Sequence, residues 1–186
     1  MPNAYQLKCL PAMGVNIHDL GCVMLDVEPI DLRGAIPEEW AYTSTNPKLS
    51  YVSGIQEEAH ITLLFGLLQN ANLIRSAVDE VLEGWEPGPI SVWTIDAFPS
   101  PLPEEPYVCL VAKIWGQGLK DAHARLSLLP HINTFPEYQP HLTLAYVHKD
   151  HANEAIRAVE NALGALDGLL STPVEPLGLN YGRMPS

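Results

Sequence analysis

The sequence predicts one α+β domain made of two similar halves, and three observations lead to this prediction. The chain has 186 residues, and single domains usually contain about 100 to 200 residues. Runs rich in apolar and β-branched residues alternate along it with segments whose apolar positions recur with a helical period. Two similar His-x-Thr triplets, beginning at His60 and His141, stand at corresponding places in the two halves.

The first half is predicted to contain two strands and a helix. A strand over residues 22–27 ends before Pro29, because proline cannot extend a hydrogen-bonded ladder. An apolar run over residues 60–68 is typical of a buried strand. Apolar residues recur about every 3.6 positions over residues 73–82, and Gly84 follows, which predicts a helix that ends there.

Residues 30–56 form a long connection between these strands without clear periodicity. Connections of this length are uncommon in compact domains unless they carry a function. Tyr42 and Tyr51 lie within it and are candidates for contact with a ligand. We therefore interpret the segment as a candidate lid over a binding site.

The second half repeats the alternation of strands and helices. Strands are predicted over residues 90–98, 107–115, 141–147 and 174–179, and helices over residues 119–129 and 153–166. The order of strands and helices is similar to that of the first half, as expected for a duplication whose copies have diverged. Residues 1–186 are accordingly predicted to form a single domain.

The charge of the chain restricts the size of its substrate. Acidic residues outnumber basic ones by 22 to 10, which gives a formal net charge of −12 and a pI near 4.8. Such a charge repels a long phosphate backbone, so we expect no binding to long nucleic acid. A pocket can still neutralise one or two phosphates with a few local donors. A small nucleotide or a cyclic oligonucleotide therefore remains a possible partner.

The cysteines and the hydropathy pattern predict a cytoplasmic protein. Cys9, Cys22 and Cys109 form a sparse, odd set without metal-ligand spacing, and two of them lie in predicted strands, so we expect reduced thiols. No apolar run approaches the roughly 18 residues that a membrane-spanning helix needs. We expect no membrane contact and a cytoplasmic location, which would be the host cytoplasm for a phage protein.

The two triplets offer a pair of imidazoles and a pair of hydroxyls. In a strand, side chains at positions i and i+2 point to the same face, so His60 projects with Thr62 and His141 with Thr143. One such triplet is typical of many buried strands and indicates little. Two of them, on strands that face each other, would bring four polar groups to one cleft.

Two histidines suit the cleavage of a phosphodiester. The ordinary imidazole pKa of about 6.5 allows one ring to accept a proton from the attacking oxygen while the other gives a proton to the leaving oxygen. The threonine hydroxyls can hydrogen-bond the non-bridging oxygens as negative charge develops there. This chemistry needs no metal and no cofactor, and the sequence contains no characteristic metal-ligand spacing.

The segments around both triplets resemble a known family. His60 lies in Glu-Ala-His-Ile-Thr-Leu-Leu-Phe, and His141 lies in Tyr-Gln-Pro-His-Leu-Thr-Leu-Ala-Tyr. They are similar to the paired His-x-Thr/Ser signatures of the two-histidine (2H) phosphoesterases, which include 2′-5′ RNA ligase-like proteins, RNA 2′,3′-cyclic phosphodiesterases and phage anti-CBASS nucleases. The resemblance covers residues 22–179. It implies a pseudo-symmetric fold of two lobes, with antiparallel sheets lining a central cleft and helices outside.

The resemblance also implies roles and a substrate. His60 and His141 would be the acid–base pair, and Thr62 and Thr143 would hold the phosphate. Short segments near residues 90–94, 121–125 and 135–138 are most similar to the anti-CBASS enzymes, which cut cyclic oligonucleotide signals and so help a virus to evade immunity. Aromatic residues that are candidates for stacking on a base are Trp93, Phe135, Tyr138, Tyr42, Tyr51 and Tyr146. The basic residues Lys113 and Arg125 are candidates for a role at the cleft.

The predicted function is the metal-independent hydrolysis of a phosphodiester in a small cyclic oligonucleotide. One alternative is an RNA-end processing enzyme that acts on 2′,3′-cyclic phosphates or 2′-5′ linkages. A second alternative is a binding protein that sequesters a nucleotide without cutting it. The presence of both complete triplets argues against this second alternative, because sequestration does not require the four groups.

Overall fold

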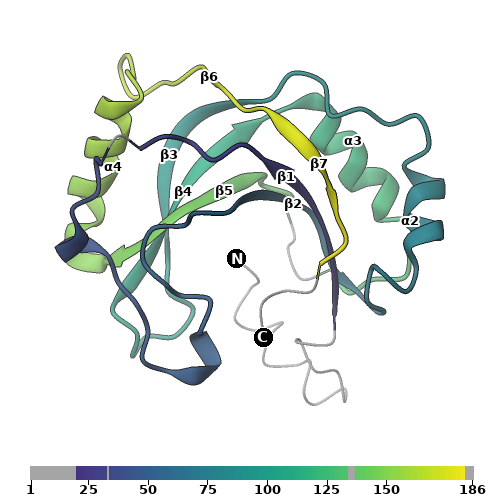
Figure 1. Cartoon of the computed structure of the whole chain (residues 1–186), viewed down its shortest axis with the longest axis horizontal. Coiled ribbons are helices and arrows are strands. Elements are labelled where there is room, and N and C mark those ends of the chain that lie inside the picture. The colour runs from purple at the N-terminus through teal and green to yellow at the C-terminus, as the bar shows by residue number, and fades with distance from the viewer. Residues whose placement is uncertain (1–19, 33, 134–136, 183–186) are drawn as a thin grey trace.

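Two antiparallel sheets form an arch, and the helices lie on its outer, convex side (Figure 1). The computed structural model describes residues 20–32, 34–133 and 137–182. The first sheet has the strand order β2 (Ala59–Leu67), β1 (Gly21–Val27) and β7 (Pro176–Asn180). The second has the order β5 (His141–His148), β4 (Tyr107–Trp115), β3 (Ser91–Pro99) and β6 (Thr172–Pro173).

The convex faces of both sheets carry the main hydrophobic core. Buried residues of the strands alternate with half-buried ones that face the other side, as in Ile61 and Leu142 between the histidine and threonine of each triplet. The strands pack here against α2 (Arg75–Val81), α3 (Gln117–Leu126) and α4 (Ala152–Ala162). The polar members of the triplets are thereby left on the concave face.

The lobes do not coincide with the two halves of the sequence. Helix α3 follows β4 in the chain but packs on β2 of the first sheet, and α4 packs on β3 and β4 of the second. The last strand, β7, returns to pair with β1. We call the sheet β2-β1-β7 with α2 and α3 the first lobe, and the sheet β5-β4-β3-β6 with α4 the second lobe.

The predicted helices are shorter in the structure, and local geometry explains why. Helix α4 ends at Ala162 rather than at residue 166, because Gly164 adopts a left-handed conformation with φ of 74°. Helix α3 ends at Leu126 rather than at residue 129. The next residue, Ser127, is its C-cap, and the Ser127 hydroxyl donates to the carbonyl of His123. The strands lie within one or two residues of the predicted positions, and the short strand β6 precedes the last predicted one without having been predicted.

The candidate lid lies along the outer edge of β5. It contains two short 3-10 helices, η3 (Glu38–Trp40) and η4 (Pro47–Leu49), and a third, η5 (Lys149–His151), follows β5. The backbone of Tyr42 donates to the carbonyl of Tyr146, and the backbone of Tyr146 donates to the carbonyl of Gly54. The segment thus covers an edge that β5 would otherwise leave unpaired, and whether it closes over a ligand stays a prediction.

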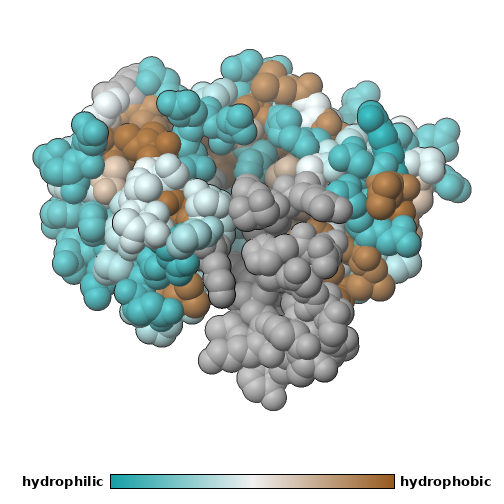
Figure 2. Space-filling model, turned by 60° about the horizontal axis from the view of Figure 1, so that its bottom comes forward, coloured by the Kyte–Doolittle hydropathy of each residue, from teal (hydrophilic) through white to brown (hydrophobic). Residues whose placement is uncertain are grey.

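The described part of the surface is mainly polar on the side toward which the arch opens (Figure 2). Figure 2 shows hydrophilic residues over most of the described part of this face, with apolar residues in separate patches. Within the described residues, no helix has the length and apolar character that crossing a membrane requires.

Candidate active site

The two His-x-Thr triplets lie on the adjoining edge strands of the two sheets. β2 and β5 are the outermost strands of their sheets and contact each other. His60 and Thr62 project from the concave side of β2, and His141 and Thr143 from that of β5, and all four are partly buried. The contact between β2 and β5 places His60 near enough to His141 for its charge to lower the pKa of that imidazole. The structure therefore brings together the four residues that the sequence singles out.

A β-bulge follows each triplet directly. In the first lobe Val23 pairs with Leu64 and Met24 with Thr62, so Leu63 is the extra residue. In the second lobe the pairs skip Leu144 in the same manner. Bulges bend a strand and redirect its side chains, and they are common beside active sites. Here each bulge marks the point where the polar triplet ends and the apolar part of the strand resumes.

His141 is held in one orientation by two contacts. Its Nδ1 lies 2.8 Å from the carbonyl oxygen of Gln139, and its ring meets Phe98 edge-on at a centroid distance of 5.2 Å. A carbonyl only accepts, so Nδ1 of the neutral ring carries the hydrogen and Nε2 has a free lone pair. Burial lowers the pKa of His141, which favours this neutral form, while the hydrogen bond to Gln139 opposes the shift.

His60 has negative charge on its side of the site. Asp26 of β1 is its cross-strand partner, and Glu58 lies two residues before it. Burial lowers the pKa of His60, while the charges of Asp26 and Glu58 act in the opposite direction and favour the imidazolium. The two histidines thus have electrostatically different surroundings.

Each threonine of the triplets has a cysteine beside it. The thiol of Cys109 donates to the hydroxyl oxygen of Thr143, with 3.7 Å between Sγ and Oγ1, and Cys22 makes a side-chain hydrogen bond with Thr62. Both cysteines are free and buried, and Cys9 lies outside the described residues. Burial raises the pKa of Cys22 to about 12 and that of Cys109 to about 11, although the threonines lower both.

These cysteines should be unreactive in the folded protein. At pH 8 their raised pKa values leave a very small fraction of thiolate, and the thiolate is the reactive form. We expect iodoacetamide to alkylate Cys22 and Cys109 more than about a hundredfold more slowly than a free thiol. Peptide mapping by mass spectrometry measures each cysteine separately, and the protein in guanidinium chloride is the control. Rapid labelling of Cys109 in the native protein would contradict the burial of this thiol.

Three of the candidate aromatic residues form one cluster at the end of β5 that is remote from His141. Tyr51 and Tyr107 both meet the ring of Tyr146 edge-on, and Tyr42 stacks on Tyr107 at 5.4 Å. The hydroxyl of Tyr42 also donates to Glu105 over 2.7 Å. Tyr42, Tyr51 and Tyr146 therefore pack largely against one another and against Tyr107.

The other candidate aromatic residues differ in their surroundings. Tyr138 stacks on His123 at 4.1 Å and donates to the backbone carbonyl of Thr62 over 3.2 Å, so one face of its ring is covered. Trp93 lies at a register shift in β3 and is 44 % exposed, which leaves it accessible for stacking. Phe135 lies outside the described residues.

Two basic residues were candidates for a role at the site, and the structure separates them. Lys113 on β4 is the cross-strand partner of His141 and forms an ion pair of 2.6 Å with Asp96. Arg125 lies on α3, where it pairs with Asp121 and donates to the carbonyl of Glu83. Lys113 therefore belongs to the surroundings of the triplets, and Arg125 belongs to the helical layer.

Among the described residues, no group of three or more His, Cys, Asp and Glu side chains is placed to hold a metal ion. His148 and His151, which have a spacing of three, contact different aromatic rings. His148 meets Tyr42 edge-on, and His151 stacks on Trp40. Their side chains therefore have packing partners of their own.

Comparisons with known proteins give a family and two solved structures. The model of the 2′-5′ RNA ligase superfamily matches residues 38–174, which include both triplets. No curated protein matches the chain significantly. A structure of Kluyveromyces marxianus Usb1 has a TM-score of 0.44 and 10 % identity and covers 81 % of this chain and 84 % of its own. A second structure, of the same protein with uridine monophosphate, has a TM-score of 0.43 and 9 % sequence identity. The match covers 80 % of this chain and 84 % of the Usb1 chain.

Two antiparallel sheets with a His-x-Thr strand on each are the features of a two-histidine phosphoesterase, and the chain is an enzyme of this class. Because the match covers well over half of its length, the chain belongs to the 2′-5′ RNA ligase superfamily.

Proposed function

We propose that this enzyme hydrolyses a phosphodiester bond of a small cyclic oligonucleotide and that it needs no metal. His60, Thr62, His141 and Thr143 are the groups that act on the substrate. The observation that supports the proposal is the position of the two triplets, which project from adjoining strands onto one concave face. Imidazoles placed on two adjoining strands can act on the same phosphate from opposite sides.

The threonines hold the phosphate. The Cys109 thiol donates to the oxygen of Thr143, so the hydroxyl hydrogen of Thr143 remains available to a phosphate oxygen. A hydroxyl positioned in this way stabilises the charge that builds on the non-bridging oxygens during cleavage. Thr62 also makes a side-chain hydrogen bond with a cysteine, Cys22, in the first lobe.

Charge supports a small substrate. The net charge of −12 disfavours a long nucleic acid, and the basic residue beside the triplets, Lys113, is already paired with Asp96. Exposed Trp93 adds an aromatic surface on which a base can stack. We expect the enzyme to act on such a substrate as a single domain in the cytoplasm.

The second candidate is RNA-end processing, which the description of the matched family favours. Its substrates would be 2′,3′-cyclic phosphates or 2′-5′ linkages at RNA ends. It shares the acid–base chemistry with the first candidate, so the substrate alone distinguishes them.

A panel of substrates tests the proposal. The purified protein is incubated with cyclic dinucleotides, cyclic trinucleotides, 2′,3′-cyclic mononucleotides and a short 2′-5′ linked RNA, and the products are identified by mass spectrometry. We expect linear products from a cyclic oligonucleotide and equal rates with and without EDTA. Cleavage of the 2′,3′-cyclic or 2′-5′ substrates alone would favour RNA-end processing. Binding without any product would support sequestration, and loss of activity in EDTA would contradict the metal-free mechanism.

A further inference from the structure

The two lobes correspond residue by residue around the triplets. Met24 of β1 lies opposite Thr62, and Val111 of β4 lies opposite Thr143. The cysteines that contact the threonines stand two positions before this residue in each lobe. Both lobes therefore place the same kinds of group around the site.

The correspondence extends to a third strand in each lobe. In the first lobe Asn180 of β7 donates to both carboxylate oxygens of Asp26, at 3.1 and 3.2 Å. In the second lobe Asp96 of β3 binds Lys113 at 2.6 Å. Asn180 and Asp96 occupy equivalent positions, because they pair with Met24 and Val111 respectively. Each lobe thus uses its third strand to hold one charged side chain on the central strand.

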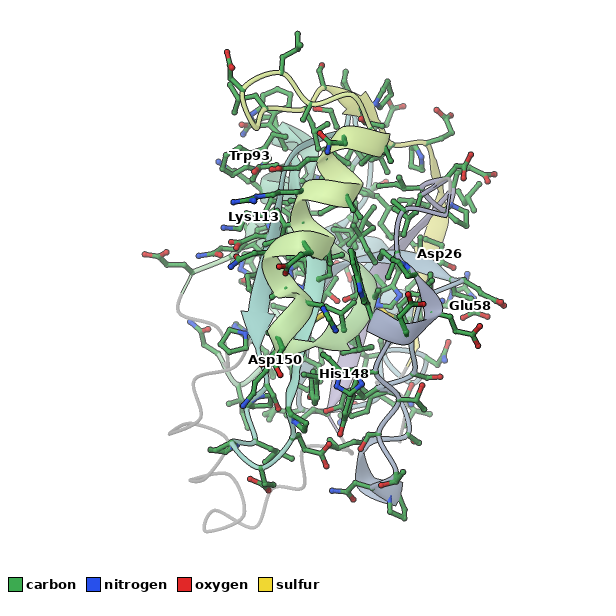
Figure 3. All side chains as sticks on the ribbon, turned by 90° about the vertical axis from the view of Figure 1, so that its left-hand side faces the viewer. Asp26, Glu58, Trp93, Lys113, His148 and Asp150 are labelled. Carbon is green, nitrogen blue, oxygen red and sulfur yellow. The ribbon has the colours of Figure 1, made fainter. Side chains whose placement is uncertain are left out.

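The two lobes differ in the sign of the charge that the central strand carries opposite the histidine. Asp26 is the cross-strand partner of His60, whereas Lys113 is the cross-strand partner of His141. Directly opposed residues of an antiparallel pair have Cβ atoms only about 5 Å apart, so these charges lie close enough to act on the imidazoles. Figure 3 shows Asp26 and Glu58 on one side of the molecule and Lys113 and Trp93 on the other.

The remaining charged groups around the imidazoles strengthen this difference. For His60, both Asp26 and Glu58 raise the pKa against the larger lowering by burial. For His141, burial lowers the pKa most, the hydrogen bond to Gln139 raises it, and the charges of His60 and Lys113 lower it further. Asp96 lies one strand further from His141 than Lys113 does, so the positive end of their pair is the nearer one.

We propose that Asp26 and Lys113 are positioning residues that give the two histidines different roles, with His60 as the general acid and His141 as the general base. This inference rests on the proposed phosphodiesterase function. Nε2 of His141 accepts the proton of the attacking hydroxyl as the new P–O bond forms. His60 gives its proton to the leaving oxygen as the old P–O bond breaks. The nucleophile therefore binds on the side of Lys113, and the leaving group binds on the side of Asp26.

Titration of the two imidazoles by NMR tests the assignment directly. His60→Gln and His141→Gln identify the resonances of the two rings. We expect Asp26→Asn to lower the pKa of His60 by at least about half a unit, because it removes the nearest carboxylate. Asn180→Asp adds a negative charge beside Asp26 and should shift the same pKa upward. If Asp26→Asn does not fold, the Asn180→Asp variant still tests the inference.

The second arm removes the positive charge. Lys113→Met with Asp96→Asn eliminates the ion pair as a whole, and we expect the pKa of His141 to rise while that of His60 changes less. Lys113→Arg keeps the charge and should leave the pKa of His141 close to that of the parent protein. Equal changes of both histidines in every variant, or none, would overturn the inference.

The pH profile of kcat distinguishes an electrostatic role of Asp26 and Lys113 from a structural one, because loss of structure alone would not shift its limbs along the pH axis. The base must be neutral, so His141 sets the ascending limb, and the acid must be protonated, so His60 sets the descending limb. Asp26→Asn should move the descending limb to lower pH, and the Lys113→Met/Asp96→Asn variant should move the ascending limb to higher pH. Movement of either limb in the other direction would overturn the assignment of roles.

The outcomes separate this inference from the proposed function. Absence of hydrolysis of every phosphodiester, together with the expected NMR shifts, would refute the function but leave the electrostatic asymmetry in place. Hydrolysis that depends on both histidines, without those shifts, would support the function and refute the role of Asp26 and Lys113.

Discussion

Replacing His141 by alanine is expected to lower kcat by about a thousandfold, within the range usual for the loss of a general acid or base. His60→Ala should have an effect of similar size, because both proton transfers occur in the same step. Substrate affinity should change little, since Thr62, Thr143 and the aromatic residues remain. Single-turnover rates and equilibrium binding of the best substrate from the panel give the two quantities.

His151→Ala is the matched control for this experiment. His151 stacks on Trp40, away from the triplets, and should leave kcat within about twofold of the parent value. An equal loss in His151→Ala and His141→Ala would show that the loss reflects folding. Retention of more than a tenth of the activity in His141→Ala would contradict the assignment of this residue.

Gly66→Ala is expected to destabilise the fold by about 3 kcal/mol or more. Gly66 has φ of 106°, which L-residues avoid, and a Cβ at this position would overlap the carbonyl oxygen of Ile132. The backbone N–H of Ile132 donates to the carbonyl of Gly66 over 2.8 Å, and displacement of this segment would weaken the bond. Urea denaturation measures the change in the free energy of unfolding.

Gly84→Ala is the control, because Gly84 also has a positive φ, of 66°, but no neighbouring atom within 4 Å of an added Cβ. It should cost only about 1 to 2 kcal/mol, the cost of the left-handed conformation. Equal destabilisation by the two substitutions would indicate that the contact with Ile132 contributes nothing.

The strands and the triplets could be predicted from the sequence because they depend on local patterns. The alternation of Ile61 between His60 and Thr62 requires only the period of a strand, and the structure has the expected burial at these positions. The convergence of the two histidines could be proposed because one triplet recurs within a similar context. The family assignment rests on the same segments, and the match to residues 38–174 confirms it.

The charged neighbours of the histidines were harder to predict, because strand register is not visible in a single sequence. Lys113 was a candidate on the basis of its charge alone, and Asp26 was missed. A signal was present: Cys22 stands four positions before Asp26, as Cys109 stands four positions before Lys113. The two bulges after the triplets also escaped prediction, because an extra residue in a strand leaves the apolar pattern almost unchanged.

The pairing of residues 30–56 shows a second limit of local patterns. The absence of periodicity predicts a loop with a function, but it does not predict that parts of the segment hydrogen-bond along β5 through isolated bridges. Such short pairings depend on a strand that comes about a hundred residues later in the chain. The sequence around the loop contains no information on this partner.

The path of the chain between the lobes bears on how the protein unfolds. Because β7 completes the sheet that β1 begins, and α3 crosses from one lobe to the other, neither lobe is encoded by a continuous stretch of sequence. Unfolding of one lobe would remove contacts that stabilise the other lobe. Calorimetry should therefore record a single cooperative unfolding transition. The pairing of β1 with β7, which lie far apart in the sequence, also raises the contact order, which predicts slow refolding.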